Sequence, residues 1–356
     1  MCIVLVTTAH PHYSLIIIDN RDEFILRPTS RPHWWTSGDH EILSARDLQR
    51  AEQGTWMGIT KAGKFAVLTN YRETDTHDAD HPVQGARSRG GMVTAWLESP
   101  TEEDIQHFVK RLLDDGVADV GGFSLLCGNL RKTKQSENQI EPLAIISNRC
   151  GSSDDVPWIG KQRGEVYGLS NTVYDDPETW PKVKMGKEKV MDVIEDVVKN
   201  ALGEEELVRK LYDVLDTDTL PKQEGQDFED YIYQLRHSIY IPPIGNEESK
   251  DVPRADEIAS AQPEVINGNG HAEHHTAINN AQGRLAAVLQ ATERPTPPPQ
   301  APMTGLYGTQ RQTIILVDWE GNASFRERSL WDPKGHPIQR GYGDMKFEFK
   351  IDGWNS

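Results

Sequence analysis

The chain opens with two short runs of β-branched and aliphatic residues joined by a turn-prone segment, and this pairing constrains the fold more than any other feature. The runs are CIVLVTT, residues 2–8, and SLIIID, residues 14–19, with AHPHY between them. Runs of this composition predict strands, and so short a connection lets two consecutive strands pair only in the antiparallel sense. The N-terminal segment therefore predicts a hairpin in which the second strand ends beside the start of the first.

Further strands are predicted in three groups along the chain. TWMGI and FAVLTNY follow a proline-containing loop, RPTSRPHWW, and a short segment with Gly63 in its middle separates them, as in a hairpin. A second group comprises GFSLLCGN, PLAIISN and EVYGLSN, and a third comprises TIILVDW, ASFRERSL and MKFEFKI. Glycine or turn-forming residues bound the runs of the second group, which is typical of short strands in antiparallel sheets.

Helices are predicted between these groups of strands. The segments with helical character are Met92–Leu97, Glu102–Asp114, Lys187–Leu202, Glu204–Leu215 and Phe228–Tyr240. Strands, helices, strands, helices and strands thus follow one another, with hairpin-like connections inside each group of strands. This order predicts an α+β protein, a four-layer αββα sandwich in which two antiparallel sheets stack between helical layers.

Residues 245–303 differ from the rest of the chain in composition. The stretch has few aromatic residues, many polar residues and a proline-rich end. Because it cannot bury enough apolar surface to offset the entropy of ordering, we expect a disordered insertion in a single domain made of residues 1–244 and 304–356. Its three clustered histidines, His271, His274 and His275, are read as solvated side chains, so no metal site is predicted.

Charge and cysteine content exclude several classes of protein. The formal net charge of −17 opposes nucleic acid and anionic membrane surfaces as partners, which favours a small molecule or a protein. Three scattered cysteines are too few for a disulfide scaffold or a thiolate zinc site, so a reducing compartment is expected. No stretch approaches the ~20 apolar residues of a membrane span, and no signal peptide is evident. We expect a cytoplasmic protein that does not span a membrane.

Cys2 is the first candidate for chemistry. If Met1 is removed, the new α-amino group has a pKa near ~8 and can take the proton of the thiol on the same residue. One residue would then supply both the nucleophile and its base. The alternative is a buried cysteine that serves as a small apolar residue at the start of a strand.

The segment NRDEF, residues 20–24, follows the second predicted strand. In the predicted hairpin it lies beside Cys2, so Asp22 could hold the α-ammonium and Arg21 could bind a substrate carboxylate or pair with an acidic neighbour. The alternative is an Asx-type turn with a surface ion pair.

Two asparagines also end predicted strands, Asn70 in LTNY and Asn171 in GLSN. Side-chain amides at such positions can stabilise an oxyanion, although most asparagines at strand ends form turns. Arg311 precedes the strand TIILVDW, where it is either an anion clamp or an ordinary charge at a strand edge. Trp56 could form an apolar wall of a substrate site or simply pack.

Six ordered motifs together resemble one family. They are MCI, NRDEFxxRP, GTWMGI, LTNY, YGLSN and GTxxxTIILVD, and they resemble the NRDE family, whose animal members are called transport and Golgi organization protein 2. The resemblance covers about residues 1–180 and resumes from 304 to the terminus. It implies a fold similar to that of N-terminal nucleophile (Ntn) hydrolases, with the cholylglycine and penicillin V acylases as the nearest analogues.

The resemblance also implies roles for individual residues. Cys2 would be the nucleophile, Asp22 would hold the amine, Asn70 and Asn171 would build the oxyanion hole, and Arg311 would match a substrate-side arginine. The acylases have an arginine just before the asparagine of the corresponding segment. Here Asp19 takes that place and Arg21 follows, which is a departure from the acylase pattern.

Two functions of different classes follow from the resemblance. The first is a hydrolase without a required cofactor that cleaves an amide or acyl bond of a small molecule through an acyl-cysteine, in a family linked to Golgi organisation and protein secretion. The second is a binding or mobilising protein on the same scaffold that holds haem or an acyl lipid without turnover. Family members are linked to the cytoplasm, the Golgi and mitochondria, so Golgi or mitochondrial association is the alternative location.

Overall fold

The computed structural model describes residues 2–73, 85, 87–114, 117, 120–133, 138–149, 152–174, 176–221, 232–245 and 305–355. Apart from Gly245, the whole predicted insertion 245–303 lies outside the described residues, and so do its three histidines. The disorder expected for that stretch therefore stays a prediction.

The first sheet, called sheet I, contains both ends of the described chain. Its six strands are antiparallel throughout and run in the order β10-β1-β2-β11-β12-β13. They are β1 (Ile3–Thr7), β2 (Tyr13–Phe24), β10 (Val166–Leu169), β11 (Tyr307–Asp318), β12 (Asn322–Ser329) and β13 (Asp344–Lys350). The N-terminal hairpin predicted from the sequence is β1–β2, and it lies inside the sheet.

The second sheet, sheet II, is built from the middle of the chain. Its seven strands are antiparallel and follow chain order from β3 to β9. They are β3 (His33–Ser37), β4 (His40–Ser44), β5 (Met57–Thr60), β6 (Lys64–Asn70), β7 (Phe123–Asn129), β8 (Leu143–Ser147) and β9 (Trp158–Ile159).

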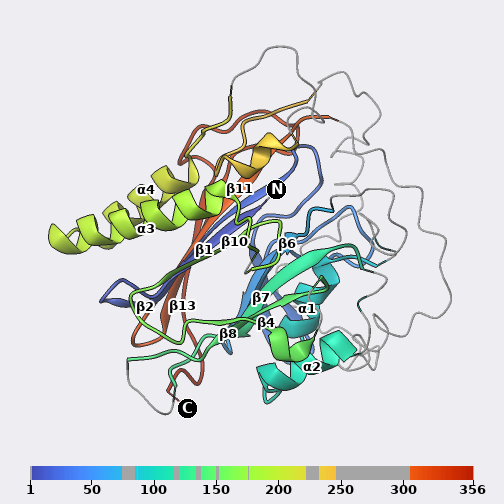
Figure 1. Cartoon of the computed structure of the whole chain (residues 1–356), viewed down its shortest axis with the longest axis vertical. Helices are drawn as coiled ribbons and strands as arrows, with labels where there is room; N and C mark the ends of the chain where they lie inside the picture. The colour runs from blue at the N-terminus through green and yellow to red at the C-terminus, as the bar shows by residue number, and fades with distance from the viewer. Residues whose placement is uncertain are drawn as a thin grey trace, which may run out of the picture.

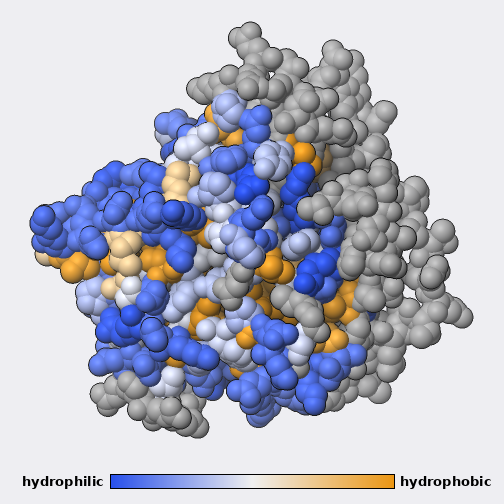
Figure 2. All heavy atoms as spheres, viewed as in Figure 1, coloured by the Kyte–Doolittle hydropathy of each residue, from blue (hydrophilic) through white to orange (hydrophobic). Residues whose placement is uncertain are grey.

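Helices cover the outer face of each sheet (Figure 1). The pair α3 (Pro181–Lys199) and α4 (Glu204–Leu215) packs on sheet I, and the pair α1 (Gly90–Leu97) and α2 (Ile105–Asp114) packs on sheet II. Figure 2 shows hydrophilic residues over the outward side of α3 and α4, as the amphipathic pattern of both helices requires. These layers confirm the predicted four-layer αββα sandwich.

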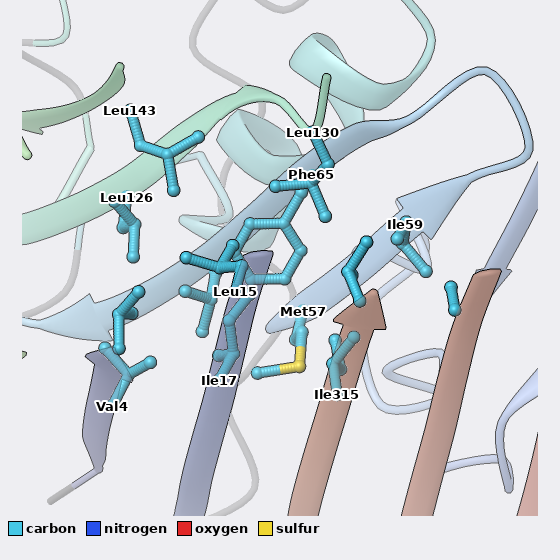
Figure 3. Packing of buried hydrophobic residues seen from close by; sticks show 14 of the residues in the cluster. Val4, Leu15, Ile17, Met57, Ile59, Phe65, Leu126, Leu130, Leu143 and Ile315 are labelled. Carbon is cyan, nitrogen blue, oxygen red and sulfur yellow. The ribbon is translucent and has the colours of Figure 1, made fainter. Parts of the chain in front are cut away.

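Apolar side chains from both sheets fill the space between them. Figure 3 shows Val4, Leu15, Ile17 and Ile315 of sheet I meeting Phe65, Leu126 and other residues of sheet II. Side chains alternate along each strand, so the next residues, such as Ile3 and Ile18, pack under α3 and α4 instead. This alternation decides which way each residue of the candidate site points.

Several predicted boundaries are wrong. Residues 33–35, assigned to a loop, belong to β3, a half-exposed strand that has no apolar alternation to reveal it. The first helix of the sheet I pair begins at Pro181 rather than Lys187, because proline is favoured in the first helical turn. The described part of the helix expected at Phe228–Tyr240 contains only a 3₁₀ turn, Gln234–Arg236.

Candidate active site

Cys2 lies one residue before β1, and the strand alternation directs its side chain into the space between the sheets. Ile3 pairs with Asn20, so the start of β1 lies beside the NRDE segment of β2, as predicted. Ile3 faces the helices and Val4 faces the inter-sheet core, which places Cys2 on the same side as Val4. The cysteine is 4% exposed.

The NRDE tetrapeptide, Asn20–Glu23, lies inside β2 and is buried along its whole length. The alternative of an Asx turn with a surface ion pair is therefore wrong, and so is the prediction that strand two ends before the tetrapeptide. Extending the alternation of Ile17 and Ile18 directs Asn20 and Asp22 toward the helical layer and Arg21 and Glu23 between the sheets.

A bulge in β11 arranges the partners of this segment. Thr309 pairs with Asp22 and Arg311 pairs with Arg21, so Gln310 is the extra residue. A bulge of one residue reverses the alternation of the strand. Thr309 can therefore face the helical side, where its hydroxyl donates to Oδ1 of Asp22 over 2.7 Å, while Arg311 lies on the inter-sheet side.

Asp22 is held from several directions in this buried position. Besides the bond from Thr309, the hydroxyl of Tyr307 donates to its backbone carbonyl over 3.2 Å. Burial raises the pKa of the Asp22 carboxyl, while the positive charges of the chain's amino terminus and of Lys182 oppose that rise. The charge of the terminal amine, which belongs to Met1 while that residue is present, therefore acts on this carboxyl group.

The thiol of Cys2 contacts the same strand. Its Sγ lies 3.8 Å from the backbone carbonyl oxygen of Asp22. The hydroxyl of Ser170 donates a 2.7 Å hydrogen bond to the backbone carbonyl oxygen of Cys2. Burial raises the pKa of the thiol to about 12, although the charge at the amino terminus lowers it. The sulfur is therefore protonated at neutral pH, and a base must take its proton before it can attack.

Asn70 and Asn171 come from different sheets and meet beside Cys2. Asn70 is the last residue of β6, whereas Asn171 follows β10 directly after Ser170, the residue that anchors Cys2. Nδ2 of Asn171 donates to the backbone carbonyl of Asn70 over 2.5 Å. Each side-chain amide carries two N–H donors, so Asn171 keeps a second one. Among the described residues, none forms a hydrogen bond with the side-chain amide of Asn70.

Arg21 and Trp56 contact each other between the sheets. The guanidinium carbon of Arg21 lies 4.6 Å from the centre of the Trp56 ring, within the range of a cation–π interaction. Nη2 of Arg21 also donates to Gln310 Oε1 over 2.8 Å and to Thr29 Oγ1 over 3.2 Å. Trp56 therefore forms a wall beside a buried cation.

Arg311 lies within β11, not before it as the sequence predicted. Its Nη1 donates to the side chain of Ser329 and, over 3.1 Å each, to the carbonyl oxygens of Gln310 and Trp331. Its Nε lies 3.6 Å from Oε1 of Glu327. Burial lowers the pKa of Arg311 to about 9. These contacts hold the guanidinium inside sheet I, so a substrate contact at Arg311 stays a prediction.

Two charged residues near Cys2 were given no role by sequence reasoning. Asp19, opposite Val4 on the inter-sheet face, is 6% exposed and has no hydrogen bond or ion pair within the described ranges. Burial raises the pKa of its carboxyl to about 8. Lys182, in the first turn of α3, is fully buried, and the charges of Asp22 and Cys2 act on it.

A sequence signal existed for some of the missed residues. Ser170 and Thr309 lie inside the motifs YGLSN and GTxxxTIILVD, directly beside residues that were assigned roles. Nothing distinguishes Lys182, because Lys184, Lys187 and Lys189 follow it in the same helix. Only the burial of its side chain identifies it.

Two features are absent from the described residues. None of their helices is long and apolar enough to cross a membrane. No group of three or more His, Cys, Asp or Glu side chains among them is arranged to hold a metal ion.

Comparisons with other sequences give one consistent result. The model of the family described as Transport and Golgi organisation 2 matches residues 1–332. The human Transport and Golgi organization protein 2 homolog is 28% identical over 321 residues, which cover 90% of this chain and 88% of the human protein. The Drosophila melanogaster protein of that name is 28% identical over 188 residues, 51% of this chain and 59% of the fly protein.

Comparisons with solved structures lead to acylases and related hydrolases. Penicillin V acylase from Agrobacterium tumefaciens aligns with 13% identity and a TM-score of 0.35, over 99% of this chain and 87% of the acylase. A mutant conjugated bile acid hydrolase from Clostridium perfringens aligns with 8% identity and a TM-score of 0.34, over 99% of this chain and 97% of the hydrolase.

Proposed function

The chain belongs to the Transport and Golgi organisation 2 family, as its motifs predicted, and on that premise we propose that it hydrolyses an amide or acyl bond of a small molecule, with Cys2 as an N-terminal nucleophile once Met1 is removed. One observation carries the proposal. Cys2, Asp22, Asn70 and Asn171 come from four separate segments and meet at one end of the two stacked sheets.

The first step of the proposed reaction is a proton transfer within Cys2. The free α-amine takes the thiol proton, and the sulfur attacks the substrate carbonyl carbon, forming the carbon–sulfur bond. Asp22, oriented by Thr309, holds the resulting ammonium in place. The ammonium then gives its proton to the leaving amine or alcohol as the carbon–heteroatom bond breaks. Water hydrolyses the remaining thioester by the same route and restores the thiol.

Oxyanion stabilisation is proposed for the two asparagines. The amide of Asn70 has no hydrogen bond to any described residue, and Asn171 retains one N–H beyond its bond to Asn70. A neutral amide can donate to a developing oxyanion without the cost of desolvating an ion. Arg21 and Trp56 would line the substrate side between the sheets, with Arg311 behind them. The relatives are named for transport and Golgi organisation, and we propose that the reaction serves that process.

The experiment is a search for the covalent intermediate. The purified protein is incubated at pH 7 with p-nitrophenyl esters of short and long fatty acids, and acylated peptides are identified by mass spectrometry. The proposal expects an acyl group on Cys2 in the wild type and none at that position in Cys2→Ala. Cys127→Ser is the matched control, because Cys127 is also buried but faces the α1–α2 layer. An unacylated Cys2 throughout, with ester turnover unchanged in Cys2→Ala, would refute the proposal.

A second candidate, the binding of an acyl lipid without turnover, is favoured by a crevice beside the same strand. The crevice lies between the sheets and is lined by Val4, Val6, Leu126, Ile145, Ile159, Tyr167, Gly168, Leu169 and Tyr174. It is narrower than a water molecule, so an acyl chain enters only if its walls part. This candidate expects saturable binding of a fluorescent fatty acid that Cys2→Ala retains. An optical titration with haem tests the haem form of the same proposal.

A further inference from the structure

Helix α3 approaches sheet I unusually closely at the strands that carry Cys2 and Ser170. A Cβ atom on Gly186 would lie 2.7 Å from Cδ1 of Leu5 in β1, and one on Gly168 of β10 would lie 2.7 Å from Val183 in α3. Glycine at both positions therefore lets the helix backbone sit directly over these two strands. Lys182 belongs to the same first turn of the helix as Val183.

The side chain of Lys182 is completely enclosed by this packing. Its exposed fraction is 0%, and its Nζ lies 5.6 Å from the centre of the Trp180 ring, which is itself buried. A lysine is almost never fully buried unless an opposite charge accompanies it. The opposite charge here is Asp22, which acts on Lys182 together with Cys2. Asp22 points toward the same helical layer, so the ammonium and the carboxyl group lie on one face of sheet I, and the thiol of Cys2 lies on the other face of the neighbouring strand, where the ammonium's charge still acts on it.

We propose that Lys182 is a positioning residue for the Cys2 nucleophile: its ammonium holds Asp22 as a carboxylate and favours the thiolate of Cys2 over the thiol. The inference rests on the proposed function, in which Asp22 orients the amine of Cys2. It assigns a role to a residue that carries no motif and that would contact no substrate.

Electrostatics explains why a cation is useful at this position. Asp22 is buried and would otherwise gain a proton, which would end its hold on the α-ammonium. A second cation nearby also disfavours protonation of the α-amine, which keeps that amine available as a base. The other charged groups that act on Cys2 are Asp19, Arg21, Arg89 and the chain's amino terminus, and the test leaves all of them unchanged.

The test compares Lys182→Met with Lys184→Met in protein that lacks Met1. Methionine keeps the length of the side chain and removes only its charge, and Lys184 is an exposed neighbour in the same turn.

Alkylation of Cys2 by iodoacetamide is followed from pH 5 to 9 by peptide mass spectrometry. In Lys182→Met alkylation is expected to slow about tenfold at each pH in this range, the change that a rise of about one unit in the pKa of the thiol would cause. Lys184→Met should match the wild type, and Lys182→Arg should recover most of the rate. A Lys182→Met profile that coincides with the wild type overturns the proposal.

A double variant keeps the proposal testable if Lys182→Met does not fold. A buried charge without its partner is strongly destabilising, whereas removal of both charges is tolerated. Lys182→Met/Asp22→Asn should therefore be more stable to urea than Lys182→Met, and equal or lower stability overturns the pairing. Neither measurement needs a substrate. If no acyl-enzyme forms, the proposed hydrolysis is overturned, but an effect of Lys182 on alkylation would still stand. If the acyl-enzyme forms normally and Lys182→Met leaves the alkylation profile unchanged, the role of Lys182 is overturned and the proposed hydrolysis stands.

Discussion

The hydroxyl of Thr309 donates a 2.7 Å hydrogen bond to Oδ1 of Asp22, and this contact exists only because β11 bulges at Gln310. The same hydroxyl accepts a 2.8 Å bond from the backbone N–H of Ile241. Thr309 is fully buried, so neither partner can turn to water if the hydroxyl is lost. One threonine thereby fixes the carboxylate that faces the chain end and ties it to the segment before the predicted insertion.

Thr309→Val should destabilise the protein by about 2 to 3 kcal/mol, because it leaves a buried carboxylate oxygen and a buried N–H without their partner. Urea unfolding measures the change. Thr313→Val is the control in the same strand, since none of the described residues forms a side-chain hydrogen bond with Thr313. That variant should change the free energy of unfolding by less than about 1 kcal/mol. Equal losses in the two variants would show that the Asp22 contact contributes nothing.

Two glycines should respond to alanine with opposite signs. A Cβ on Gly54 would lie 2.7 Å from the backbone carbonyl carbon of Gly90, whereas a Cβ on Gly91 meets nothing within 4 Å. Gly54→Ala should therefore lower the melting temperature, with a cost of about 1 to 3 kcal/mol from the backbone shift it forces. Gly91→Ala lies in α1 and should raise stability by up to about 1 kcal/mol through helix propensity. Calorimetry on both variants decides, and a stable Gly54→Ala protein would contradict the close approach of this loop to α1.

Asp19 should make the protein less stable as the pH rises. Burial raises the pKa of its carboxyl to about 8 in the folded state, against about 3.9 in an unfolded chain. Between these pH values the folded state holds a proton that the unfolded state lacks. The contribution of Asp19 to the free energy of unfolding is therefore complete below about pH 4 and is lost as the pH approaches 8.

Asp19→Asn removes this proton linkage. The variant should be more stable than the wild type at pH 8 by at least about 1.4 kcal/mol, the equivalent of one pKa unit, and the difference should shrink toward pH 4. Urea unfolding at several pH values measures it. A difference that stays constant with pH would mean that Asp19 is ionised in the folded protein.

Much of the architecture could be predicted because its signals are local. The β-branched runs around AHPHY and the short connections inside each group of strands require antiparallel sheets, and amphipathic periodicity marks α2 and α4. The family could be predicted because its motifs are ordered along the chain. The position of Cys2 beside the second strand followed from the predicted hairpin, and the position of Asn171 at a strand end followed from the run YGLSN.

The orientation of the site could not be predicted, because it depends on contacts between distant segments. By propensity alone, the four polar residues of NRDE indicate a turn. Pairing with β11 keeps them in a strand instead, and side chains of β11 cover Asp22 and Arg21. The bulge at Gln310 has no local sequence signal. The burial of Lys182 depends on how α3 packs on β1, which no periodicity within the helix reveals.

The central claim is that the thiol and a free α-amine belong to the same residue, Cys2. The most direct test is the intact mass and N-terminal peptide of the protein purified from the cells that naturally make it. The account expects a chain that has lost Met1 and bears an unmodified amine on Cys2. A chain that retains Met1, or one whose Cys2 amine is acetylated, would contradict it.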